Sequence, residues 1–108
     1  IERAHAHGFE IIGATLTPFE DTFQGSALEG YYNPEKEMKR EAVNEWIRTG
    51  GGFDGVIDFD KLVADPANPK HISATYDSGD HLHPNDAGYA AMGSAVDLTL
   101  LGIEAPSN

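Results

Sequence analysis

Two segments, FEIIGATLTPF (residues 9–19) and FDGVIDFD (residues 53–60), constrain the fold more than any other feature of this sequence. In the first, apolar side chains fall on both faces of an extended strand and do not alternate with polar ones. Strands that are apolar on both faces are typical of parallel sheets covered by helices. Because Pro18 cannot donate to a sheet, we expect it to end the first strand. Both segments are therefore predicted to be buried parallel strands.

Helices are predicted on either side of the first strand. Residues 1–7 have the pattern of a helix end that closes at Gly8. Before the second helix, Asn33 is placed to act as N-cap and Pro34 to occupy the first helical position. An apolar stripe at helical spacing follows, and we expect it to face the core, with Trp46 as a packing residue; its members are Met38, Ala42, Val43, Trp46 and Ile47.

The remaining segments are predicted from breaker residues and capping residues. Residues 20–32, DPANPK (65–70) and 71–84 are expected to be loops, and the first is long enough to suggest a role in function. Asp60 is expected to cap a short turn. A final helix is predicted from Asn85 or Asp86 to about Leu101, with one apolar face and Gly102 at its end; the face comprises Tyr89, Met92, Val96 and Leu100.

The alternation of helix and strand predicts βαβ units and places the chain in the α/β class. Two parallel strands alone make a poor core and leave backbone donors and acceptors unpaired at the sheet edges. We therefore expect the complete sheet to contain more strands than residues 1–108 supply.

Composition excludes several kinds of partner. Lys and Arg total 7 against 18 Asp and Glu, which gives a net charge of −11 with neutral histidine. Such a charge repels nucleic acid and anionic lipid, and the chain has no apolar run long enough for a membrane span. There is no cysteine, so disulfides, thiolate ligands and a cysteine nucleophile are absent.

The stretch DSGDHLHPNDAGYAAMGSAV (residues 77–96) carries the chemistry. Asp80 and His83 are three residues apart in a polar loop that leads into the final helix. A carboxylate can hold the Nδ1–H of an imidazole, fix its tautomer and stabilise the imidazolium, which leaves Nε2 free to take a proton from a nucleophile. Histidine suits that role because its ordinary pKa of about 6.5 is close to working pH.

Within this stretch, DHLHPNDAGYAAM resembles the last block of the SGNH (GDSL-type) hydrolases, approximately D-x-x-H-P-N-x-x-G-Y followed by the final helix. GFEIIGATLTPF, WIRTGG and GVIDFDKLVADPANP also look like segments of secreted bacterial and fungal members, so secretion is expected on this ground alone. The resemblance implies a flavodoxin-like three-layer α/β/α sandwich and hydrolysis of carboxylic esters. Residues 1–108 would form the C-terminal part of that single domain.

The resemblance assigns two catalytic residues, His83 as general base and Asp80 as its orienting acid. It gives His81 no catalytic role, and Pro84, Asn85 and Gly88 match the block as turn and helix-start residues. The family's serine lies in a G-D-S motif, and a glycine and the asparagine of G-x-N-D form its oxyanion site. None of these motifs occurs in residues 1–108. The expected partners are therefore an ester substrate and either the missing N-terminal half or a second copy of the chain, with no cofactor.

Three alternatives remain at the level of sequence. The segments HAH (5–7) and DHLH (80–83) supply imidazoles and a carboxylate that suit zinc, so His5, His7 or His81 is a candidate metal ligand. The chain could instead be a self-associating structural fragment. It could also have a weak activity that uses Asp80, His81 and His83 with water as the nucleophile. Tyr31 and Tyr32, in the loop 20–32, could line a sugar or acyl site or pack on the missing half.

Overall fold

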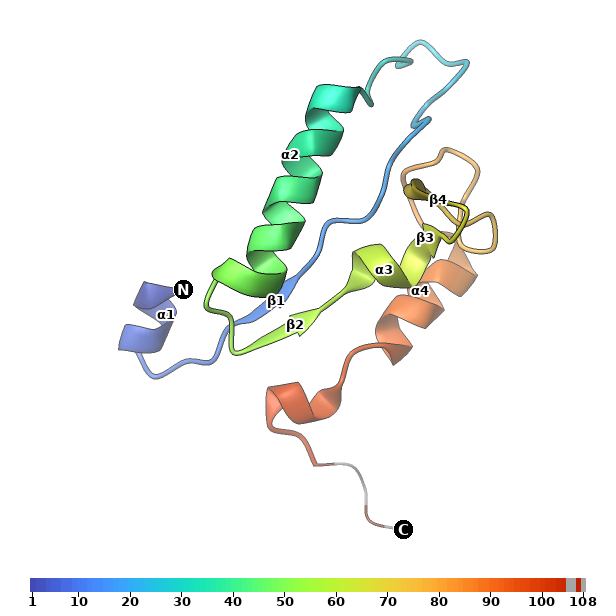
Figure 1. Cartoon of the computed structure of the whole chain (residues 1–108). Helices are drawn as coiled ribbons and strands as arrows, with labels where there is room; N and C mark the ends of the chain where they lie inside the picture. Colours follow the sequence, from blue (N-terminus) through green and yellow to red (C-terminus); the bar gives the residue numbers. More distant parts are fainter. Residues whose placement is uncertain (105–106, 108) are drawn as a thin grey trace.

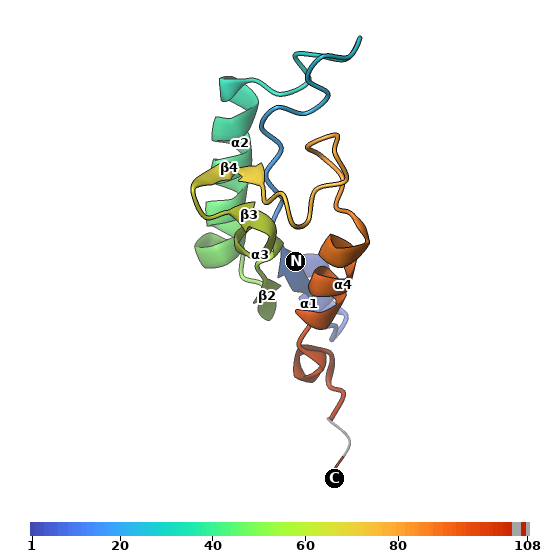
Figure 2. The ribbon, with the colours of Figure 1, turned by 90° about the vertical axis from the view of Figure 1, so that its right-hand side faces the viewer.

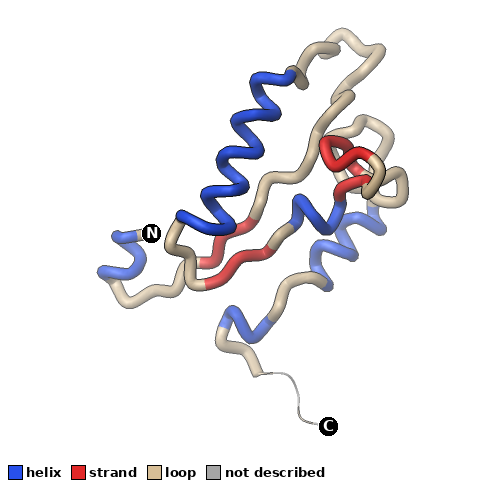
Figure 3. The backbone as a smooth tube through the Cα atoms, in the orientation of Figure 1, coloured by secondary structure: helices blue, strands red, loops and turns tan. Residues whose placement is uncertain are grey.

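The computed structural model describes residues 1–104 and 107, in which short helices and strands alternate along the chain (Figure 1, Figure 3). The elements are α1 (Glu2–Ala6), β1 (Ile12–Ala14), α2 (Pro34–Glu45), a π-helical turn (Trp46–Gly50), β2 (Gly55–Ile57), α3 (Phe59–Val63), β3 (Ala64–Asp65), β4 (Asn68–Ile72), α4 (Asp86–Ser94) and a 3-10 helix (Leu98–Leu101). The mixture of helix and strand confirms the α/β class.

Strands β1 and β2 pair in parallel, as predicted, with Gly13 opposite Val56. Each strand is only three residues long, so the prediction of strands over residues 9–19 and 53–60 was wrong in extent. Gly13 is required here because a Cβ at this position would lie 2.7 Å from the ring of Phe53. Among the described residues this sheet has two strands, and most positions in it are only partly buried.

Residues 64–72 contain a hairpin that the sequence did not predict. β3 and β4 pair antiparallel, so the expected loop at residues 65–70 was wrong. Asp65 Oδ1 accepts from the Ala67 N–H at 2.9 Å, a local contact typical of turns, and Pro69 is tolerated in such a short edge strand. The expected cap was also misplaced, because Asp58 and not Asp60 caps α3 by accepting from the Lys61 N–H at 3.2 Å.

The face that α2 presents to the rest of the chain is polar, contrary to the prediction. Met38 is 70% exposed and Trp46 49% exposed, while Ile47 alone of the predicted stripe is buried. The buried residues of α2 are instead Glu37, Arg40 and Asn44. The prediction that Trp46 packs in the core was therefore wrong, because in this structure its side chain is half exposed.

Asn44 shows why a polar face is buried. Its Oδ1 accepts from the Leu16 N–H at 2.7 Å, and its Nδ2 donates to the Leu16 carbonyl at 2.8 Å. Leu16 lies just beyond β1, where the described residues form no further strand pairing. Asn44 is fully buried, and a buried amide without hydrogen-bond partners is strongly destabilising. The Asn44 amide therefore replaces a neighbouring strand.

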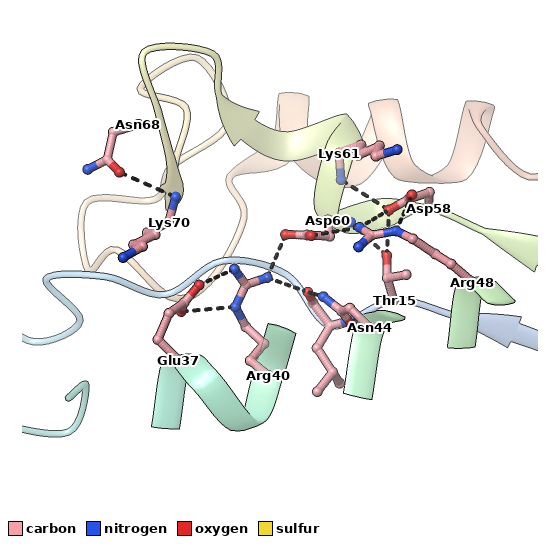
Figure 4. Close-up of polar contacts among 11 residues, drawn as sticks. Thr15, Glu37, Arg40, Asn44, Arg48, Asp58, Asp60, Lys61, Asn68 and Lys70 are labelled. Atoms are coloured by element: carbon pink, nitrogen blue, oxygen red, sulfur yellow. Dashed lines mark hydrogen bonds and ion pairs between the residues drawn. The ribbon is translucent and has the colours of Figure 1, made fainter. Parts of the chain in front are cut away.

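A network of ion pairs extends this polar face (Figure 4). Arg40 pairs with Glu37 and, at 2.5 Å, with Asp60 Oδ1. Arg48 donates to Asp58 Oδ2 at 2.8 Å and to Asp60 Oδ2 at 2.8 Å. Arg40 and Glu37 are both almost fully buried. The network joins α2 and the π-helical turn to Asp58 and Asp60, which follow β2.

The final helix begins where predicted and ends earlier. Asn85 caps α4 by accepting from the Gly88 N–H at 2.9 Å. Gly88 is tightly packed, since a Cβ would lie 2.8 Å from the Tyr76 carbonyl oxygen. α4 ends at Ser94, and Gly102, with φ of 69°, closes the separate 3-10 helix. The two views place α2 and α4 on opposite sides of β2 (Figure 1, Figure 2).

The chain is expanded for its length. Its radius of gyration is 16.0 Å, against about 13 Å for a compact domain of this size. Among the described residues, the buried apolar side chains larger than alanine are few, namely Pro18, Ile47, Val63 and Ile72. No helix in this part of the chain is long and apolar enough to cross a membrane. Polar contacts therefore contribute an unusually large share of the tertiary structure.

The network predicts a large effect for Arg40→Met. The substitution keeps most of the side-chain volume but leaves Glu37 without its arginine partner and Asp60 with Arg48 alone. Breaking a buried ion pair in this way typically destabilises by about 3–5 kcal/mol. Urea unfolding should show that loss, whereas Lys39→Met, which removes an exposed pair with Glu35, should change the free energy by less than about 0.5 kcal/mol. Equal effects of the two substitutions would contradict this account.

Because of Asp58, the free energy of unfolding should decrease at acidic pH. Hydrogen bonds from Arg48, opposed by burial and aided by the Lys61 N–H, lower the pKa of Asp58 to about 2. Since its ordinary pKa is about 3.9, the stabilisation is complete above that value and is lost as pH falls from about 4 toward 2. The free energy of unfolding, measured in urea at several pH values in this window, should fall more steeply for the wild type than for Asp58→Asn. Parallel curves would refute the assignment.

Candidate functional site

The stretch that carries the candidate site forms a closed loop between β4 and α4. A β-bridge joins Asp77 to Pro84, and the Ser78 N–H donates to the His83 carbonyl at 3.0 Å. The Asn85 N–H donates to the Tyr76 carbonyl at 2.7 Å. These contacts bring the start and end of the loop together immediately before α4. The side chains between them are thereby held in one small region.

Asp80 and His83 meet within this loop. His83 Nδ1 lies 2.6 Å from Asp80 Oδ2. Asp80 Oδ1 accepts from the N–H groups of His83 at 2.8 Å and Leu82 at 2.9 Å, and from the Ser78 hydroxyl at 3.1 Å. Because the carboxylate is an acceptor, Nδ1 of His83 carries the proton. Nε2 is then the basic nitrogen, on a side chain that is 60% exposed.

The surroundings of Asp80 favour its charged form. Partial burial of the carboxylate opposes ionisation, but hydrogen bonds from the His83 ring and from the N–H groups of His83 and Leu82 outweigh it. Together they hold the pKa of Asp80 well below its usual range. A permanent negative charge therefore lies beside the His83 ring, where it would stabilise an imidazolium.

A second carboxylate–imidazole pair occupies the same loop. His81 Nδ1 hydrogen-bonds to Asp77 Oδ2, and Asp77 Oδ1 accepts from the N–H groups of Gly79 at 2.8 Å and His81 at 3.0 Å. The Asp77 side chain is only 6% exposed. Its burial raises the pKa, but the hydrogen bonds from Gly79 and His81 prevail and lower it. His81 adopts a φ of 62°, a conformation uncommon for a residue other than glycine.

His71, at the end of β4, joins the second pair. Its ring centroid lies 4.8 Å from that of His81. Donor atoms of His71, Asp77 and His81 all lie within 4.8 Å of one another, the one such group of three found among the described residues. The histidines His5 and His7 are not in it: His5 Nε2 contacts Asp54 Oδ2 at 2.8 Å, and His7 stacks on Phe9. Among the described residues, HAH and DHLH are therefore not brought together in one such group.

An open apolar hollow lies beside the loop. It has a volume of about 440 Å³, and its lining includes Leu16, Tyr31, Val43 and Leu82. Leu82 stands between His81 and His83 in the sequence, so the hollow and the candidate site share a backbone segment. Tyr31 lines this hollow, while Tyr32 lines a smaller one of about 120 Å³.

Sequence analysis missed Asp77 and His71. Asp77 precedes His81 by four residues, as Asp80 precedes His83 by three, so the duplicated carboxylate–histidine pattern was visible in the sequence. His71 carried no such signal. It reaches His81 only because the β3–β4 hairpin turns back toward the loop, and that hairpin was predicted as a loop.

The chain resembles known proteins in both sequence and fold. Residues 1–96 match the family model described as GDSL-like Lipase/Acylhydrolase. The crystal structure of a GDSL-like lipase from Bacteroides thetaiotaomicron aligns with a TM-score of 0.64 and 18% identity, covering 94% of this chain and 47% of that one. The chain thus spans about half the length of that structure, and no curated protein matches it. The family match covers most of the chain, and the chain belongs to the GDSL-like lipase/acylhydrolase family.

Proposed function

We propose that residues 1–108 supply the general base and its orienting acid to a carboxylic ester hydrolase. His83 is the base and Asp80 the acid. The observation that carries the proposal is the 2.6 Å contact between His83 Nδ1 and Asp80 Oδ2, in a loop that leads into the final helix of a GDSL-family chain. Nε2 lies on the side of the ring away from the carboxylate, and the ring is well exposed, so the hydroxyl of a nucleophile can reach it.

The geometry suits proton transfer in both halves of ester hydrolysis. Nε2 of His83 would take the proton from a serine hydroxyl as the oxygen attacks the ester carbonyl, and the Asp80 carboxylate would stabilise the resulting imidazolium. The same proton would then pass to the departing alcohol. In the second half, His83 would activate water against the acyl-enzyme in the same way. Asp80 keeps its negative charge throughout.

The serine is proposed to come from a segment other than residues 1–108. None of the five serines lies in a G-D-S motif, and the matched lipase has about half its length outside the aligned region. The apolar surfaces of this chain fit such a partner. Met38, Val43 and Trp46 are exposed on α2, and the hollow beside Leu82 is open.

The missing strands would complete a three-layer sandwich around β1 and β2. They would cover the exposed apolar side chains and pair the free strand edges. A second copy of this chain would also cover apolar surface, but it would bring no G-D-S serine. We therefore assign the hollow and the apolar face of α2 to the serine-bearing segment, and not to the acyl group of the substrate.

The proposed function leads to two predictions, of which the first concerns ester hydrolysis. Residues 1–108 alone should show no His83-dependent hydrolysis of p-nitrophenyl acetate. In a polypeptide that joins them to a G-D-S block, His83→Ala should lower kcat by at least roughly 10³-fold, since triad members act as a unit. His7→Ala, at the exposed end of α1, is the matched control and should leave kcat unchanged. A His83-dependent burst from residues 1–108 alone would overturn the proposal for the serine's origin.

The second prediction tests the orienting role of Asp80 without any nucleophile. In Asp80→Asn, the amide oxygen can still accept from the backbone N–H groups, while the amide nitrogen faces His83 Nδ1. His83 should then switch to the tautomer protonated at Nε2, which cannot act as a base there. Two-bond ¹⁵N–¹H NMR spectra of the imidazoles report this directly. Asp77→Asn should affect His81 and leave His83 in its original tautomer; an unchanged His83 in Asp80→Asn would contradict the role.

A further inference from the structure

We propose that His71, Asp77 and His81 form a binding site for a divalent transition-metal ion, with Zn²⁺ the ion that suits the donors best. The site is separate from the Asp80–His83 pair and does not rest on the proposed esterase function. It joins β4 to the loop that carries that pair. Sequence analysis did not group these three residues: it did not consider His71 or Asp77, and it grouped His81 with the HAH segment.

The donor atoms are already near the spacing that one ion requires. Atoms bound to a tetrahedral zinc at about 2.0–2.1 Å lie roughly 3.3 Å from one another. One donor atom each from His71, Asp77 and His81 lies within 4.8 Å of the others. To bind one ion, the three donor atoms would have to approach one another by up to about 1.5 Å.

The tautomer of His71 prepares it to bind a metal. Its Nδ1 lies 2.6 Å from the carbonyl oxygen of Ile72, which can only accept, so Nδ1 carries the proton. Nε2 is then the nitrogen with the free lone pair, on a ring whose centroid lies 4.8 Å from that of His81. A backbone carbonyl that holds the opposite ring nitrogen is the usual support for a metal-bound histidine.

Asp77 supplies a charged oxygen in a protected position. The carboxylate is almost fully buried, and N–H groups of Gly79 and His81 hold its Oδ1. Oδ2 contacts His81, so the carboxylate can bind the ion directly or orient the ring that does. A cation bound between this carboxylate and the two imidazoles would add a favourable charge–charge interaction in a partly buried place.

Asp21 offers a possible fourth donor. Its Oδ2 lies 3.7 Å from His71 Nε2, too far for a hydrogen bond but close to the separation of two donors on one ion. Two imidazoles and one or two carboxylates favour zinc and its neighbours over Mg²⁺ or Ca²⁺, which prefer oxygen donors. The net charge of −11 also raises the local concentration of cations.

The test is a titration of the tag-free polypeptide with Zn²⁺ alone, in which isothermal titration calorimetry measures the binding. Wild type should bind one ion per chain, and His71→Gln or His81→Gln should weaken binding at least about tenfold. His5→Gln, His7→Gln and His83→Gln should bind as the wild type does. The His83 control separates this site from the catalytic pair, so the two proposals can fail independently.

A measurement on the unmutated protein guards against misfolded variants. In NMR spectra, Zn²⁺ should shift the ring resonances of His71 and His81 at one equivalent, before those of His5 and His7 respond. Absence of saturable one-to-one binding would overturn the proposal. So would binding that survives His71→Gln, or early shifts confined to His5 and His7, which would locate the ion at the first helix.

Discussion

The buried guanidinium of Arg40 is the interaction on which the rest of this structure depends. It pairs with Glu37 on its own helix and with Asp60 after β2, and it donates to the Leu16 carbonyl at 3.0 Å. One side chain thus holds together α2, the end of β1 and the start of α3. In most domains an apolar core does this work. Here the buried apolar side chains are too few to form such a core, and the charged network takes its place.

That arrangement divides the surface of α2 into a polar face and an apolar face. The polar face meets β1 and β2, where it satisfies backbone groups and buried carboxylates. The apolar face, with Met38, Val43 and Trp46, is left in contact with water. The expanded radius of gyration and the three-residue strands have the same cause, because sheet edges and apolar faces lack neighbours among these residues.

The loop between β4 and α4 shows how burial separates two chemically identical pairs. Asp80 with His83 and Asp77 with His81 are each a carboxylate bonded to Nδ1 of an imidazole. The first histidine is well exposed, which suits exchange of protons with a substrate. The second carboxylate is almost fully buried and has a second imidazole beside it, which suits a bound cation. The functions we propose for the two pairs follow from this difference.

Local contacts explain what could be predicted and where prediction stopped. The Asn33 and Asn85 caps and the Asp80–His83 contact each join residues three apart, so they lie within reach of local sequence patterns. For Asp80 and His83 the spacing alone was weak evidence, and the longer block DHLHPNDAGYAAM identified the pair. The parallel pairing of β1 and β2 followed from apolar content and alternation. The burial of Trp46 was predicted wrongly because helical periodicity identifies an apolar face without saying what covers it.

The amino-acid sequence by itself determined the family, the α/β class, the helix starts and the adjacency of Asp80 and His83, since each depends on short-range geometry or on a continuous motif. Only the tertiary structure decided that α2 buries its polar face, that residues 64–72 form a hairpin, and that His71 lies against His81. These depend on contacts between segments distant in the chain, where the need to satisfy buried backbone groups and carboxylates outweighs the local pattern.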